Sequence, residues 1–259
     1  MSNPGCGVCV KGEDTVPLNE KIADWVDKVV NGIILLIGIV LMLIGTYSML
    51  DNLWIYQHAG DSSLKVYKPE LNQPIAEEQQ ITENQVAWIS VDNTSIDYPV
   101  MQGTDNAVYL NKDPYGQFSL SGSIFLDCRN NLDFEDDYSL IYGHHMEGDA
   151  MFGALDMYRS QSYFGAHRIG MLTTKSAVYR YDIFAVIEDD GTNQILFNPV
   201  RYTKDEVMAY IEENYLLYHK PDPSLKLLAL STCQGATTER LLVFGTLCEI
   251  NEEAVTDEF

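Results

Sequence analysis

The stretch from Val29 to Leu50 limits what this chain can fold into more than any other feature. It carries no charged side chain and only scattered polar ones. Wound as a helix it would measure about 33 Å, and the hydrocarbon core of a bilayer is about 30 Å thick. No small-residue cleavage site of the A-x-A type follows it, so we expect an uncleaved membrane anchor and not a signal peptide. A buried core helix, the alternative, would be shorter and would show a polar face.

This anchor divides the chain into segments of different composition. We expect a cytoplasmic segment at 1–28, the transmembrane anchor at 29–50, a linker or helical stalk at 51–85, a folded domain at 86–251 and an acidic tail at 252–259. Lysines are slightly more frequent before the anchor than just after it, which favours a cytoplasmic N-terminus.

Short apolar runs bounded by Gly and polar residues recur through the folded domain, and such runs are typical of strands. The expected strands are 86–91, 95–101, 122–126, 138–142, 169–174 and 178–187, followed by two more between 226 and 247. The sequence Thr203-Lys-Asp-Glu206 is a capping box, and it predicts a helix with apolar residues from Val207 to Tyr218. Many short strands with few helices predict a closed all-β barrel.

Reactive side chains stand at the ends of three expected strands. Cys233 ends one apolar run, Arg240 begins the next, and His144 follows the run that ends at Gly143. A thiol with a nearby imidazole is what nucleophilic cysteine chemistry requires, and a guanidinium can stabilise a developing oxyanion. An inert core thiol is the usual fate of a lone Cys, and an Arg at a strand end often only pairs with a carboxylate.

Successive side chains of a strand point to opposite faces, and this alternation assigns the residues beside Cys233 and His144 to one face or the other. Ser231 shares the face of Cys233 and is a candidate for substrate placement, while Thr232 is a weaker candidate that could instead pack or bond to the backbone. His145 points away from His144, so we expect an exposed spectator there.

Six stretches resemble motifs of the sortases: Tyr-Gly-His-His at 142–145, Leu-Ser-Thr-Cys at 230–233, Arg240, and the class B stretches 96–103, 122–127 and 151–153. The resemblance covers residues from about 86 to 250. It implies a mainly β fold, an eight-stranded sortase barrel with peripheral helices, on the extracellular face of the membrane. The sequence departs from the family at 228–229, where a Thr-Leu lead-in is commoner, and at Cys128, where class B members often carry Tyr.

The resemblance also implies a cysteine transpeptidase of Gram-positive surface-protein anchoring. Cys233 would form a thioester with a C-terminal sorting signal of a secreted protein, with His144 as acid and base and Arg240 at the carbonyl. The acceptor would be an amine of a cell-wall precursor such as lipid II, or a pilin lysine, and no cofactor is implied. The residues alone leave open a hydrolase that uses water and a non-catalytic surface module.

Composition excludes several other functions. A net charge of −22 argues against nucleic acid as a partner, although a cationic partner stays open. Neither a P-loop nor an HExxH motif is present, and the acidic stretch from Asp127 to Asp137 lacks the spacing of a calcium loop. We expect that stretch to be a solvated loop and no metal to be bound. The CxxC of residues 6 and 9 is a lone half-site, which chance explains as well as a metal or redox pair does.

Overall fold

The computed structural model describes residues 18–59, 62–233 and 238–250, and the side chain of Cys233 lies outside the described part. The chain divides into two compact units, Met1–Leu53 and Trp54–Phe259. The expected acidic tail at 252–259 and the Cys6–Cys9 pair lie outside the described residues.

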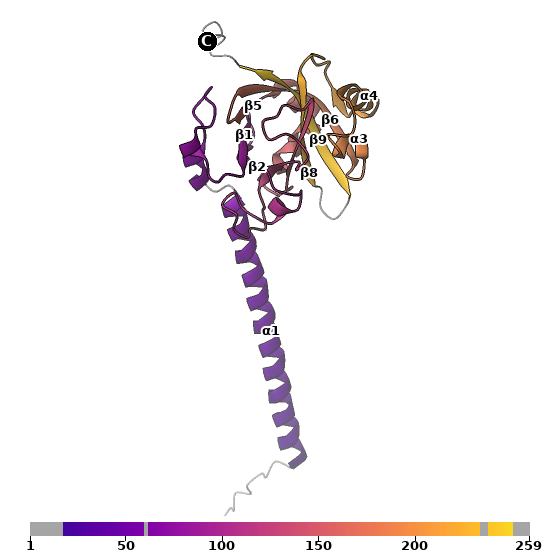
Figure 1. Cartoon of the computed structure of the whole chain (residues 1–259). Helices are drawn as coiled ribbons and strands as arrows, with labels where there is room; N and C mark the ends of the chain where they lie inside the picture. Colours follow the sequence, from indigo (N-terminus) through magenta and orange to yellow (C-terminus); the bar gives the residue numbers. More distant parts are fainter. Residues whose placement is uncertain (1–17, 60–61, 234–237, 251–259) are drawn as a thin grey trace, which may run out of the picture. The chain divides into compact units, whose positions relative to one another are not determined.

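The first unit is dominated by one continuous helix, α1, which spans Leu18–Ala59 and has 42 residues (Figure 1). Within it, Trp25–Leu50 has a mean hydropathy of 2.6 over its most apolar window, and none of that window is buried. The hydroxyl of Thr46 donates to the Met42 carbonyl at 2.9 Å, so this polar group is satisfied inside the helix. An apolar helix of this length without a protein core around it is a candidate membrane span.

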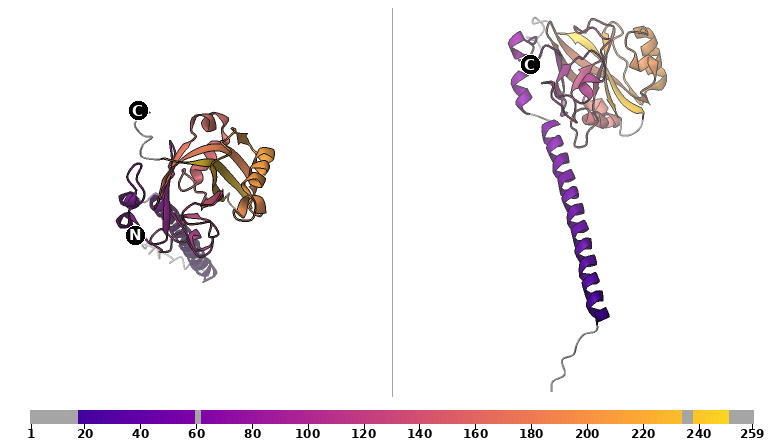
Figure 2. Two further views of the ribbon diagram at one scale, coloured as in Figure 1. Left: turned by 45° about the horizontal axis from the view of Figure 1, so that its top comes forward. Right: turned by 60° about the horizontal axis from the view of Figure 1, so that its bottom comes forward.

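The second unit is built on a closed barrel of eight strands (Figure 2). The ring runs β5-β1-β2-β3-β4-β8-β9-β6 and closes through pairing of β5 with β6. Two pairs, β2 with β3 and β4 with β8, are parallel, and the other pairs of the ring are antiparallel. The strands are β1 (Gln85–Val91), β2 (Asp97–Met101), β3 (Ile124–Leu126), β4 (Tyr138–Gly143), β5 (Ile169–Thr174), β6 (Val178–Asp190), β8 (Lys226–Cys233) and β9 (Glu239–Glu249), with the short β7 (Leu217–Tyr218) added on β6. The predicted eight-stranded barrel is therefore confirmed.

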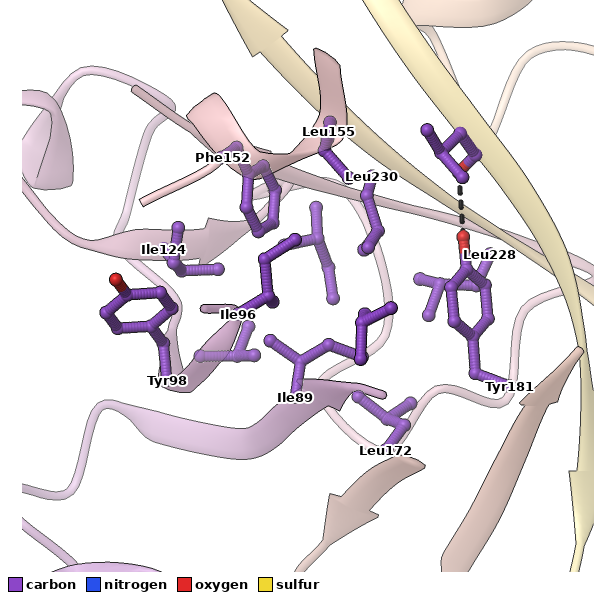
Figure 3. Packing of buried hydrophobic residues seen from close by; sticks show 14 of the residues in the cluster. Ile89, Ile96, Tyr98, Ile124, Phe152, Leu155, Leu172, Tyr181, Leu228 and Leu230 are labelled. Carbon is purple, nitrogen blue, oxygen red and sulfur yellow. Dashed lines mark hydrogen bonds between the residues drawn. The ribbon is translucent and has the colours of Figure 1, made fainter. Parts of the chain in front are cut away.

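Alternate residues of these strands fill the barrel interior (Figure 3). Buried apolar side chains from β1, β5, β6, β8 and β9 meet there, and η4 (Gly153–Arg159) contributes Leu155. The Tyr181 hydroxyl lies within this core, and it donates to the Val243 carbonyl at 2.7 Å. A Cβ at Gly245 would lie 2.3 Å from the Tyr181 ring, so close packing requires glycine at that position.

A second core covers part of the outer face of the barrel. Helices α3 (Gln194–Phe197) and α4 (Lys204–Asn214) pack there on residues of β4, β6, β8 and β9. The predicted capping box is present at the start of α4, where the Glu206 carboxylate accepts from the Thr203 N–H at 2.8 Å. The helix ends at Asn214, and Tyr218 belongs to β7, so the predicted helical face is shorter than expected.

Residues just before β1 pack against the barrel. Leu64, within η1 (Ser62–Tyr67), and Ile75, further along the chain, are buried against Trp88 of β1. Asp97 accepts from Trp88 Nε1 and from Lys68 Nζ, each at 2.8 Å. The segment 64–81 is therefore part of the folded unit.

Candidate active site

Three neighbouring strands bring the predicted site residues to one edge of the barrel. In the parallel pair of β4 and β8, Gly143 lies beside Thr232, so the next residues along are His144 and Cys233. In the antiparallel pair of β8 and β9, Cys233 lies opposite Arg240. The backbone therefore places residues 144, 233 and 240 side by side in that order.

The same three positions share one face of the sheet. On β4, β8 and β9 the residues of the outer core alternate with those of the barrel interior: Tyr138, Leu140, Leu227, Ala229, Leu242 and Phe244 lie outside. The same alternation, continued toward this end of the strands, reaches 144, 233 and 240. The candidate site thus lies on the outer face at the end of the barrel, on the face that α3 and α4 cover further along.

The ring of His144 is half-buried and has a defined partner. Its Nε2 lies 2.7 Å from the carbonyl oxygen of Leu110, at the end of η3 (Val108–Leu110). A carbonyl oxygen only accepts, so Nε2 carries the hydrogen and Nδ1 is the nitrogen that can exchange a proton. The backbone carbonyl of His144 also accepts from Phe152 N–H at 3.0 Å.

The segment that carries the Leu110 carbonyl is tightly held. Gly122 has φ +59, and a Cβ there would lie 2.5 Å from the Leu110 oxygen. Asp105 Oδ1 accepts from the N–H groups of Ala107 and Val108 at 2.8 and 3.1 Å. The segment forms a single 3-10 turn, η3, with Asp105 just before it.

Arg240 is the second residue of β9 and lies beside a turn that follows β6. Gly191 N–H donates to the Thr238 carbonyl at 2.8 Å, and a Cβ at Gly191 would lie 3.4 Å from Arg240 Nε. Thr238 Oγ1 donates to Asp190 at 2.5 Å. Hydrogen bonds from Thr192 and Thr238, together with the charge of Arg240, lower the pKa of Asp190 to about 2. This turn therefore supports the start of the strand that carries Arg240.

Ser231 and Thr232 lie on opposite faces. Ser231 shares the outer face with residue 233 and is 1% exposed; its Oγ has no hydrogen-bond partner in the described part of the chain. Thr232 is fully buried on the interior side. The structure thus brings Ser231, and not Thr232, to the face of the candidate site.

The prediction that His145 is exposed is wrong, because its side chain is only 27% exposed and has a carboxylate partner; that it takes no part in the chemistry stays a prediction. Its Nε2 lies 2.7 Å from Asp156 Oδ2, and Asp156 also contacts Arg159, which pairs with Glu188 on β6. The adjacent residues His144 and His145 thus have different partners, because alternation turns His144 toward the outer face and His145 toward η4.

The sequence predicted that Asp127 belongs to a solvated acidic loop, and this prediction is wrong for that residue. Its side chain is fully buried, and it accepts a bidentate pair of hydrogen bonds from Arg129 at 2.8 and 2.6 Å. Burial alone would raise the pKa of Asp127, but the bonds from Arg129 and Asn106 hold it below its ordinary value. The available sequence signal was its position directly after an apolar strand.

Fold and family agree on the class of protein, the cysteine transpeptidases. A family profile described as Sortase domain matches residues 89–248, which is more than half of the chain. The chain belongs to the sortase family, whose members anchor surface proteins, and its relatives are of class B.

Three similar proteins illustrate the relationship. Sortase B of Staphylococcus aureus is 28% identical over 180 residues, which cover 67% of this chain and 74% of the relative. Sortase B of Listeria monocytogenes is 34% identical over 119 residues, or 46% of this chain and 48% of that protein. A solved class B sortase of Streptococcus pyogenes, involved in pilus biogenesis, has a TM-score of 0.60 and 40% identity, covering 65% of this chain and 94% of the other.

Proposed function

We propose that this sortase is a membrane-anchored transpeptidase that cuts a C-terminal sorting signal through a thioester on Cys233 and passes the acyl group to an amine. The observation that carries the proposal is the backbone register, which sets residues 144, 233 and 240 next to one another on one face. A nucleophile, a base and an oxyanion donor are what acyl transfer needs at one place.

The first half-reaction forms the acyl-enzyme. The Cys233 thiolate attacks the carbonyl carbon of the scissile peptide bond, and Arg240 donates to the oxygen on which negative charge develops. The C–N bond then breaks, and Nδ1 of protonated His144 delivers a proton to the leaving amine. The products are a thioester, the free C-terminal fragment and neutral His144.

The second half-reaction reverses these roles. An incoming primary amine attacks the thioester, and Nδ1 of neutral His144 takes the proton that the amine loses. The C–S bond breaks, an amide forms and the thiolate is released. The Leu110 carbonyl holds Nε2 throughout, so one nitrogen gives and takes the proton in both halves.

Ser231 is the better supported of the two proposed substrate contacts. Its buried hydroxyl, which has no hydrogen-bond partner among the residues that the structure describes, lies two residues before Cys233 on the same face, where a carbonyl or amide of the sorting peptide would satisfy it. Thr232 faces the barrel interior, which argues against direct contact with a peptide on the outer face.

The acceptor and the membrane arrangement complete the proposal. Similarity to the Streptococcus pyogenes enzyme favours a pilin lysine, with a cell-wall precursor amine such as lipid II as the other acceptor. Residues 29–50, which lie within the apolar span Trp25–Leu50, would anchor the chain, with residues 1–28 in the cytoplasm and the barrel outside. The sortase catalytic domain would extend over 86–251, and the part of the connector at 64–81 would pack against it.

One experiment separates this proposal from its rivals. The full chain in detergent is incubated with a library of five-residue sorting peptides, with and without a primary amine, and products are identified by mass. We expect an amide product in the presence of amine and none from Cys233→Ala. Only the hydrolysed acid would indicate a hydrolase, and no acyl-enzyme with any peptide would indicate a non-catalytic module.

A further inference from the structure

We propose that Asp127 is a positioning residue for His144, because it fixes both the strand that carries the imidazole and the segment that binds it. This inference rests on the proposed function of His144. Asp127 is 17 residues away in sequence and lies in a different motif, at 122–127.

The carboxylate of Asp127 is the centre of a dense hydrogen-bond cluster just after β3. It accepts five hydrogen bonds: Arg129 Nε at 2.8 Å, Arg129 Nη2 at 2.6 Å, Arg129 N at 3.0 Å, Asn106 Nδ2 at 2.8 Å and Tyr142 Oη at 3.0 Å. The carboxylate is fully buried, so each of these bonds forms away from water and constrains its donor strongly.

The first route to His144 runs through Tyr142. This residue lies on β4, two positions before His144 and on the same face of the sheet. Its hydroxyl is tied to Asp127, and its ring packs on Phe125 with the ring centroids 5.3 Å apart. The end of β4 is therefore held from the side on which the imidazole lies.

The second route runs through Asn106. Its Nδ2 donates to Asp127 and its Oδ1 accepts from Cys128 N–H at 2.8 Å, so the amide is oriented from both ends. Asn106 stands just before η3, whose last residue, Leu110, supplies the carbonyl that accepts from His144 Nε2. One carboxylate thus fixes the strand that carries the ring and the acceptor that orients it.

Charge explains why this position holds an acid. Every neighbour of Asp127 in the cluster is a donor, and an ionised carboxylate only accepts. Asp127→Asn keeps the shape but replaces one acceptor oxygen with an NH2 group that faces donors. At least one of Arg129, Asn106 and Tyr142 would then lose its partner and move.

The test compares three variants of the full chain in detergent. Asp127→Asn disrupts the cluster, and Tyr142→Phe removes one bond while leaving the carboxylate well satisfied. Tyr138→Phe is the matched control: Tyr138 lies on the same strand and face, is 1% exposed, and donates instead to the Leu196 carbonyl at 2.8 Å. It removes a buried hydroxyl without touching Asp127.

Three readouts are needed. They are kcat and KM separately for thioester formation with a sorting peptide, the pH dependence of Cys233 alkylation by iodoacetamide, and the side-chain nitrogen NMR signals of His144. We expect Asp127→Asn to lower kcat about 10- to 100-fold and Tyr142→Phe about 3- to 10-fold. Both variants should shift the pH profile and the His144 signals, whereas Tyr138→Phe should lower only the melting temperature.

The proposal is overturned if the pH profile and His144 signals of Tyr142→Phe match those of the unaltered chain, or if Tyr138→Phe moves them equally. Should Asp127→Asn fail to fold, the comparison of the two Tyr variants decides alone. Failure of the proposed function looks different, because the unaltered chain would then form no acyl-enzyme with any peptide, or Cys233→Ala would still form one.

Discussion

In the proposed reaction, Cys233 attacks as a thiolate while His144 carries a proton. A free thiol has a pKa of about 8.5 and an imidazole about 6.5, so a thiolate–imidazolium pair is a minority form unless the site changes both values. We expect the alkylation rate of Cys233 in the full chain to keep rising between pH 6 and pH 9. A rate that is already constant at pH 6 would show a fully ionised thiol and contradict the expectation.

Arg240 should be sensitive to replacement even by another cation. Its planar fork offers donors in a fixed geometry, which a Lys ammonium on a flexible stem does not reproduce. We expect Arg240→Lys to lower kcat/KM for a sorting peptide about 100-fold with the melting temperature unchanged. Arg201→Lys, on an exposed loop, is the control. Retained turnover in Arg240→Lys would leave the residue with a structural role only.

The buried carboxylate of Asp127 should also affect stability at acid pH. Its pKa in the folded chain is below its ordinary value, so the unfolded chain takes up the proton first as pH falls. The stabilisation is complete above the unfolded value of about 3.9 and is lost as pH falls through the folded value. We expect the unfolding free energy to drop more steeply between pH 5 and pH 3 in the unaltered chain than in Asp127→Asn, measured by urea titration. Parallel slopes would contradict this.

At the scale of elements, helix α4 combines local sequence signals with packing on the barrel. The capping box sets its first turn, and Val207 and Ile211 bury its inner face against the outer core. Its C-terminal end is decided by β7, whose two residues pair with Ala185 and Val186 of β6. Pairing with a strand distant in sequence therefore overrode the helical pattern that continues to Tyr218.

The cap of α4 gives a test of stability without an effect on chemistry. We expect Thr203→Ala to lower the unfolding free energy by about 1 kcal/mol, because a first-turn N–H loses its acceptor. Turnover should be unchanged, since the cap lies at the far end of the sheet face from residue 233. Thr203→Ser keeps the hydroxyl and should restore the stability. A drop in turnover that exceeds the drop in folded fraction would show that α4 also shapes the substrate face.

At the scale of the whole molecule, the anchor and the barrel predict a defined membrane topology. Cys6 and Cys9 precede the candidate span, and Cys128, Cys233 and Cys248 follow it. We expect a membrane-impermeant maleimide to label the unaltered chain on intact cells, and we expect no labelling when the three later cysteines are replaced by Ala. Labelling that survives their replacement would place the N-terminal segment outside and reverse the proposed orientation.

Sequence patterns were sufficient for features that depend on neighbours along the chain. The uncharged run 29–50, the strand-forming runs, the capping box at Thr203 and the reactive ends of three strands are all local signals, and each follows from periodicity or from side-chain chemistry. The motif order around His144, Cys233 and Arg240 identified the family for the same reason.

Tertiary structure alone decided which distant residues meet. The place of residues 144, 233 and 240 on the outer face, the contact of the Leu110 carbonyl with Nε2 of His144, the pairing of His145 with Asp156 and the burial of Asp127 all depend on strand register and on loop packing. No period in the sequence encodes such contacts, because they join segments that are far apart in the chain and depend on how the whole barrel packs.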